Sequence, residues 1–267
     1  MNPQPVSTGS DYDRLAEALL ATGLVTDPWV DGQPRLASQP LAIPAAQLRA
    51  LYRAAERLAA ATHEAAMQVA ADPTLLDDFF SLTPVQKLLW ASSAPLWHGI
   101  ARADLFLVDG PDGPHAICCE LNADTPSGQP EAVLLGPATG VPADRDPNRE
   151  LEARFADLLD RFLAAVDRHG RTEPPAVGIV YPTEIAGDFA LIRLYQHWCQ
   201  ARGLHVVLGS PYNLTPAPGG RVALFGTPCD LLIRHYKTDW WGERLPIWAD
   251  EDPYPDPDPL SGPLSVL

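Results

Sequence analysis

The stretch Arg102–Asn122, which reads RADLFLVDGPDGPHAICCELN, decides the fold of the middle of this chain. It holds two apolar runs separated by Gly110–Pro114, a segment dense in turn-forming residues. Apolar runs on both sides of such a segment are typical of a β-hairpin. We therefore expect two antiparallel strands whose connection is centred on Asp112.

Symmetric pairing about that centre sets Asp104 opposite Glu120 and Arg102 opposite Asn122, and opposed residues share a face of the sheet. Two facing carboxylates repel, so the pair requires a shifted pKa, a nearby arginine or a bound cation. Two carboxylates and an amide form an all-oxygen set that suits Mg²⁺ better than zinc. The alternative is a solvated hairpin face on which Arg102 neutralises one acid.

Length and charge limit the class of protein. A chain of 267 residues with 46% hydrophobic residues can bury a core as one domain, or as one domain with a smaller helical annex. Lys and Arg number 19 against 34 Asp and Glu, so the net charge is −15. Such a surface argues against nucleic acid as a partner and is compatible with cationic ligands such as amines.

The cysteines and the hydropathy pattern indicate the compartment. Four cysteines occur without CxxC spacing, at Cys118, Cys119, Cys199 and Cys229, so we expect buried free thiols rather than disulfides or a zinc cage. A nucleophilic role remains open for Cys118, which alternation places on the face of Glu120. No apolar window is long enough for a membrane span and no leader is recognisable. We expect a soluble, cytoplasmic protein.

Before and after the hairpin the sequence predicts helices. Helical periodicity or capping residues mark the following segments: Asp11–Ala21, Pro44–Ala71, a helix opened by Thr83-Pro84, Glu131–Leu135 and Asn148–His169, the last closed by Gly170.

The second half of the chain predicts a parallel sheet. Strands at 176–181 and 204–208 flank a helix at 188–202, which is a βαβ unit. Shorter strands at 221–225 and 230–235 extend it to half of a doubly wound α/β sheet. Neither GxGxxG nor a P-loop is present. We predict an N-terminal helical region (1–98), an α/β domain (99–241) and a Pro/Asp-rich linker or tail (242–267).

Three segments resemble the glutathionylspermidine synthase family, whose synthetase part is a circularly permuted ATP-grasp ligase. They are the hairpin with the following residues to Ala132, the strand and helix from Val177 to Val207, and Leu232–Trp241. The resemblance implies a pre-ATP-grasp-like α/β fold, in which a half Rossmann-like sheet and a β-hairpin follow N-terminal helices. It also implies an amide-forming reaction, in which ATP phosphorylates a carboxylate and an amine attacks the acyl phosphate.

By the same resemblance the polar hairpin residues take roles. Asp104, Glu120 and Asn122 match the family's Mg²⁺ ligands, and Arg102 matches the arginine that steadies the transferred phosphoryl group. Substrate would be bound by residues that follow the second strand, namely Asp124, Thr125 and Ser127. Thr125 stands where some members have serine, which leaves the substrate open.

The family's ATP clamp lies C-terminal to the matched part, and no lysine follows Lys237 here. We therefore expect a fragment of a longer ligase, a protein completed by another chain that carries an ATP-grasp domain, or a non-catalytic module that binds an amine, a peptide or a partner protein. A hydrolase based on Cys118 lacks a triad, since only His98 and His115 lie near it in sequence.

Overall fold

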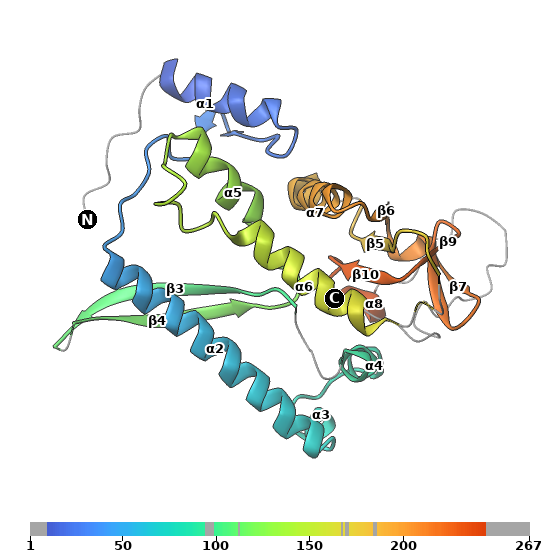
Figure 1. Ribbon diagram of the computed structural model, residues 1–267. Helices are drawn as coiled ribbons and strands as arrows, with labels where there is room; N and C mark the ends of the chain where they lie inside the picture. The colour runs from blue at the N-terminus through green and yellow to red at the C-terminus, as the bar shows by residue number, and fades with distance from the viewer. Residues whose placement is uncertain are drawn as a thin grey trace. The chain divides into compact units, whose positions relative to one another are not determined.

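The computed structural model describes residues 10–93, 99–111, 113–166, 168, 171–183 and 186–243 (Figure 1). Helices and small sheets alternate along the chain, so the predicted mixed α/β class is confirmed. The chain divides into two compact units, and each is discontinuous in sequence. The first comprises residues 1–42, 127–160 and 184–202, and the second comprises residues 43–126, 161–183 and 203–267. The domain boundaries expected at residues 98 and 241 stay predictions.

The first unit is mainly helical. It contains α1 (Ser10–Ala21), α5 (Gln129–Ala138), the first part of α6 (Leu151–Ala165), η1 (Ala186–Asp188) and α7 (Phe189–Ala201), with a small hairpin of β1 (Trp29–Val30) and β2 (Gln33–Pro34). Helix α1 buries Tyr12, Leu15 and Leu19 against Leu134 and Leu135 of α5. The Tyr12 hydroxyl also accepts hydrogen bonds from the Arg35 and Leu36 amides at 3.0 and 3.2 Å.

Helices α2 (Ala45–Ala71), α3 (Leu75–Asp78) and α4 (Pro84–Ser92) open the second unit. The predicted start of α4 is confirmed as a capping box. The Gln86 amide donates to Thr83 Oγ1 at 3.3 Å, and the Gln86 side chain accepts from the Thr83 amide at 2.9 Å. The predicted hairpin follows as β3 (Arg102–Gly110) and β4 (Gly113–Asn122), and α2 packs on it (Figure 1).

A parallel sheet forms the centre of the second unit. Its strands lie in the order β10 (Leu231–Arg234), β5 (Ala176–Val180), β6 (His205–Gly209), so the predicted parallel pair is confirmed. The predicted strand at 230–235 is also confirmed, as β10, which pairs with the other edge of β5. The segment 221–225 was expected to extend this sheet, and that expectation is wrong. It forms β8 (Arg221–Leu224), which pairs antiparallel with β7 (Leu214–Ala217) and β9 (Thr227–Cys229).

Shorter elements complete the second unit, namely η2 (Pro211–Asn213) and α8 (Thr238–Glu243). Two predicted helices have other bounds than expected, since α5 is longer and α6 begins at Leu151 and ends at Ala165. The predicted helix stop at Gly170, His98 and the tail beyond residue 243 lie outside the described residues.

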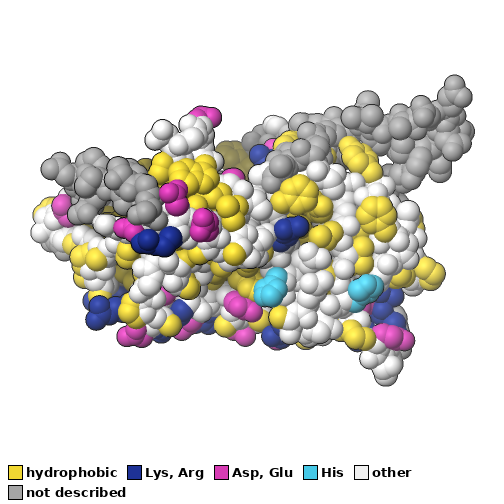
Figure 2. All heavy atoms as spheres, turned by 90° about the horizontal axis from the view of Figure 1, so that it is seen from above, with side chains coloured by type: hydrophobic (Ala, Val, Ile, Leu, Met, Phe, Trp, Pro, Cys, Tyr) yellow, Lys and Arg dark blue, Asp and Glu magenta, His cyan; other side chains and the backbone are white. Residues whose placement is uncertain are grey.

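The surface carries charges of both signs. Figure 2 shows acidic and basic side chains scattered among exposed hydrophobic ones on the face that it presents. Within the described ranges, none of the helices combines the length and the apolar composition needed to cross a bilayer.

The parallel sheet and the β7-β8-β9 sheet of the second unit meet at a glycine of β5. Leu224 of β8, Cys229 of β9 and Leu232 of β10 belong to one buried cluster. A Cβ atom at Gly178 would lie 2.5 Å from Leu232 Cδ2 and 2.9 Å from Cys229 Sγ. No side chain larger than hydrogen fits there without moving the cluster.

We predict that Gly178→Ala lowers the free energy of unfolding by about 1–3 kcal/mol, because the added methyl group overpacks this core. Urea denaturation followed by circular dichroism measures the change. Gly187→Ala serves as the control, because a Cβ there meets no atom within 4 Å. Equal stability of the two variants would contradict the packing described here.

Candidate functional site

The open end of the hairpin brings together the four residues that the sequence singled out. Arg102 of β3 pairs with Asn122 of β4, and Asp104 pairs with Glu120, as expected. The pairing arises differently from the prediction, however. Gly110 pairs with Gly113, so the connection is shorter than one centred on Asp112, and an irregularity after Asp104 restores the register.

That irregularity is a β-bulge at Cys119. Asp104 pairs with Glu120 but the next residue, Leu105, pairs with Cys118, which leaves Cys119 without a partner on β3. Asp104 and Leu105 are adjacent on β3 and therefore point to opposite faces of the sheet. Their partners Glu120 and Cys118 consequently lie on opposite faces as well. The expected shared face is wrong because the bulge interrupts the alternation.

The thiols are free, but only two are buried as expected. Cys199 and Cys229 are buried, whereas Cys118 and Cys119 are exposed. Burial raises the pKa of Cys199 to about 12 and also raises that of Cys229, so these two thiols stay protonated at neutral pH. Neither supplies a thiolate nucleophile.

The quartet is held together by nitrogen donors on carboxylate oxygens. Arg102 Nε donates to Asp104 Oδ1 at 2.8 Å, and Arg102 Nη2 donates to Oδ2 at 3.2 Å. Asn122 Nδ2 lies 3.0 Å from Glu120 Oε1 and 3.4 Å from Asp104 Oδ2. A two-bonded guanidinium and a bridging amide therefore offset the repulsion between the two acids.

This cluster lies on an open face. The side chains of Arg102 and Asp104 are 43% and 36% exposed. Two residues further along β3, and therefore on the same face, Phe106 is 62% exposed and pairs with Ile117, which is 49% exposed. A ligand at the quartet would thus meet an apolar pair beside the charges.

The ion pair shifts the ionisation of both partners. The Arg102 guanidinium, chiefly through its hydrogen bond, lowers the pKa of Asp104 from its usual range. The hydrogen bond to Asp104 likewise raises the pKa of Arg102. Both groups are therefore charged at neutral pH.

The side-chain oxygens at this site are of the kind that binds Mg²⁺, although in the structure the carboxylates accept hydrogen bonds from Arg102 and Asn122. Asp104, Glu120 and Asn122 can offer three oxygen ligands. To do so, Asn122 must turn its amide oxygen inward and Arg102 must release Asp104. In the described part of the chain, no three His, Cys, Asp or Glu side chains group as a metal site.

Asp124, expected to bind substrate, is bound by the protein itself. The amide and the hydroxyl of Thr238 donate to its carboxylate at 2.7 and 2.8 Å, at the start of α8. Arg234 Nη1 lies 2.5 Å from Asp124 Oδ1 and donates to the Tyr236 carbonyl. Asp124 thus ties the end of the hairpin to the carboxyl end of β10.

Arg234 and Thr238 were not among the predicted site residues, although both lie in the third segment of the family resemblance. The resemblance of the whole segment Leu232–Trp241 could have drawn attention to them, but nothing in its residue spacing indicated a contact with Asp124. The remaining predicted residues differ in place. Thr125 is half-buried in the second unit, and Ser127 is exposed in the first.

We predict that the carboxyl group of Asp104 titrates below the usual aspartate range, and that Arg102→Gln returns its pKa towards that range. The depressed pKa means that Asp104 favours the folded state above the unfolded aspartate pKa and loses this effect as the pH falls through its folded pKa. NMR titration of the side-chain carbonyl carbon measures both midpoints. An unchanged midpoint in Arg102→Gln would rule out the ion pair in solution.

We predict that Asp124→Ala lowers the free energy of unfolding by about 1–3 kcal/mol, because it removes the acceptor for Thr238 and leaves Arg234, only 16% exposed, without its carboxylate. Asp124→Asn keeps one oxygen acceptor and should cost less. Denaturant titration measures both. The exposed Asp144→Ala is the control and should change stability by less than about 0.5 kcal/mol; an equally mild Asp124→Ala would refute the tie.

Comparison with known proteins gave likenesses to solved structures. No family model and no curated protein matches this chain. Among solved structures, a glutathione synthetase-like effector from Globodera pallida, in its apo form, is similar with 14% sequence identity and a TM-score of 0.48. The match covers 83% of this chain and 56% of the effector, so the chain spans little more than half the length of that protein.

Proposed function

We propose that this chain is the substrate- and Mg²⁺-binding portion of an ATP-dependent carboxylate–amine ligase that resembles glutathionylspermidine synthase. The observation that carries the proposal is the hairpin register. Asp104 and Glu120 face each other, with Arg102 and Asn122 as the next pair. These residues are also the ones that the family resemblance assigns to metal and phosphoryl binding.

In the proposed reaction, a substrate carboxylate oxygen attacks the terminal phosphorus of ATP, which forms an acyl phosphate and releases ADP. The amine then attacks the acyl carbon, loses a proton and expels phosphate, so an amide bond forms. Asp104, Glu120 and Asn122 would hold Mg²⁺, which supplies neutralisation of phosphate charge when it is bound. Arg102, once it leaves Asp104, would donate its N–H fork to the transferred phosphoryl group.

Nucleotide binding needs further groups. The resemblance places the lysines that grip ATP C-terminal to the matched part, and the sequence has no lysine after Lys237. We propose that a further segment or a separate chain supplies this clamp. The activity of such an assembled ligase, and its acid and amine substrates, are part of the proposal.

The alternative function is a non-catalytic module that binds an amine, a peptide or a partner protein. One observation favours it. The acidic groups are already satisfied by Arg102 and Asn122 without a metal ion, and they lie beside the exposed Phe106–Ile117 pair. Such a surface suits a cationic ligand with an apolar part.

We predict that the chain binds Mg²⁺ in isothermal titration calorimetry and that Asp104→Asn or Glu120→Gln weakens this binding by about tenfold or more. Each change removes one charged oxygen ligand and leaves the shape of the side chain nearly unchanged. Asp109→Asn is the matched control, because Asp109 is exposed on the same strand but on its other face. Unaltered Mg²⁺ binding in both site variants would remove the metal assignment.

A second measurement tests whether the chain acts as a ligase without a further clamp. The chain is mixed with ATP, Mg²⁺ and candidate acids and amines, namely glutathione, peptides and polyamines, and phosphate release is followed. Release that Asp104→Asn abolishes supports the ligase. Polyamine binding with no release across the whole set would exclude a ligase that works without a further ATP clamp.

A further inference from the structure

A buried aspartate lies far from the hairpin cluster in sequence and has a different set of partners. Asp230 comes between β9 and β10, and its side chain is 2% exposed. Its amide donates to the Ala176 carbonyl at 2.7 Å, and its Oδ2 accepts from the Ala176 amide at 2.9 Å. The carboxylate thus joins the amino ends of the parallel strands β5 and β10.

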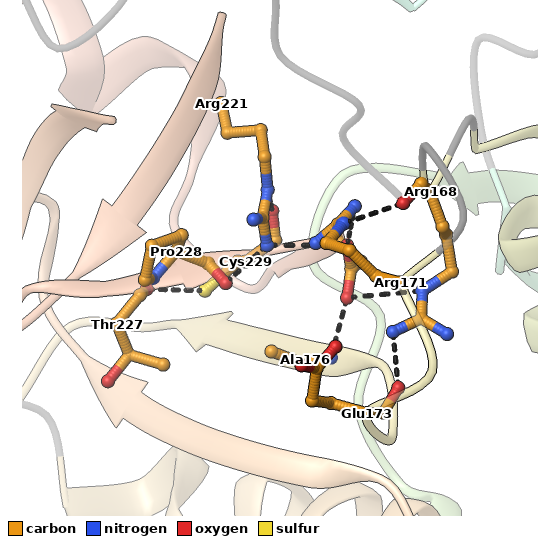
Figure 3. A network of polar contacts seen from close by, with 9 residues as sticks. Arg168, Arg171, Glu173, Ala176, Arg221, Thr227, Pro228 and Cys229 are labelled. Atoms are coloured by element: carbon orange, nitrogen blue, oxygen red, sulfur yellow. Dashed lines mark hydrogen bonds and ion pairs between the residues drawn. The ribbon is translucent and has the colours of Figure 1, made fainter. Parts of the chain in front are cut away.

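Three arginines, labelled in Figure 3, form ion pairs with this one carboxylate. Arg171 Nη2 lies 2.7 Å from Asp230 Oδ1, Arg221 Nη2 lies 3.3 Å from the same oxygen, and Arg168 Nε lies 3.8 Å from Oδ2. Two of them come from the segment between α6 and β5, and the third comes from β8. Separate parts of the second unit therefore contribute to the cluster.

The remaining partners of these arginines carry no formal charge. Arg221 donates to the carbonyls of Cys229 and Pro228, at 3.3 and 2.6 Å. Arg171 Nε donates to the Arg168 carbonyl at 2.9 Å, and Arg168 donates to the Glu173 carbonyl. Across the described ranges, Asp230 is the one carboxylate that forms ion pairs with the three guanidinium groups.

The cluster therefore holds three positive charges against one negative charge, a surplus of two, in a chain whose net charge is −15. Guanidinium groups so close together repel one another when an anion does not compensate them. The surplus also has access to solvent, since the side chains of Arg168, Arg171 and Arg221 are 23%, 26% and 26% exposed while the carboxylate is covered.

We propose that Arg168, Arg171 and Arg221 form a binding site for a phosphoryl group, with Asp230 as the buried anchor that holds the three guanidinium groups in place. A surplus of two positive charges matches a dianion, and the planar N–H fork of arginine matches phosphate oxygens. Arg168 Nε is buried, lies 3.8 Å from the Asp230 carboxylate and makes no hydrogen bond within the described structure, so an incoming oxyanion would supply an acceptor that this donor lacks.

This site is distinct from the hairpin cluster. Asp230 lies at the amino ends of β5 and β10, whereas the tie between Arg234 and Asp124 lies at the carboxyl end of β10. The proposal therefore does not depend on the ligase assignment. The competing view is that the arginines only lock the segment before β5 onto β10.

Calorimetric titration with inorganic phosphate tests the proposal, with sodium chloride of equal ionic strength as the reference. We expect saturable phosphate binding that Arg171→Gln and Arg221→Gln each weaken by about tenfold or more, the usual effect of losing one charge-assisted hydrogen bond. Arg57→Gln, on the exposed surface of α2, should leave the affinity unchanged. Circular dichroism of each variant reports whether it folds.

Asp230→Asn distinguishes a binding site from a lock. It removes the one negative charge among the three guanidinium groups but keeps a side-chain oxygen that can hold them in place. Phosphate should therefore bind severalfold more tightly, even if the variant is less stable. This measurement also decides the matter if the arginine variants fail to fold. Phosphate heats no larger than those of chloride, equal affinity in Arg171→Gln and Arg221→Gln, or unchanged or weaker binding in Asp230→Asn would each overturn the proposal.

Discussion

The pairing register of the hairpin is the constraint on which the proposed site depends. Asp104 meets Glu120 only because one extra residue, Cys119, is accommodated in β4 after a tight connection. Without that bulge the ladder that starts from Gly110 and Gly113 would set Asp104 opposite Cys119. A one-residue slip moves every side chain of a strand to the other face, so the acids would then no longer share a face.

The same bulge explains which features of the hairpin could be predicted from the sequence and which could not. The composition of 102–122 predicted two strands and their polar end correctly, and even the opposed pairs, although from a turn centred on the wrong residue. Two displacements cancelled, since the connection is shorter by one residue and β4 contains one residue more. Alternation alone could not reveal this, and Cys118 was therefore assigned to the wrong face.

Contacts between residues distant in sequence could not be predicted from composition and alternation. The apolar run at 221–225 has the composition of a strand, but composition does not say which sheet a strand joins, and β8 pairs with β7 and β9. Asp124 is a polar residue that follows a strand, which is typical of a ligand site. Two of its contacts, however, are made by a threonine 114 residues later. Arg168, Arg171 and Arg221 come together only through the strand order β10-β5 and the placement of β8.

The two charged clusters also differ in what holds them. At the hairpin, an exposed guanidinium binds both oxygens of Asp104. An exposed ion pair contributes little to stability because water screens it, so Arg102 can exchange Asp104 for another anion at small cost. At Asp230 the carboxylate is covered, and it is also fixed by a backbone amide, so its arginines cannot leave without uncovering a buried charge. An arginine that can exchange its partner, such as Arg102, suits the proposed binding of a phosphoryl group during its transfer. The fixed arginines around Asp230 suit the proposed binding of a phosphoryl group that is not transferred.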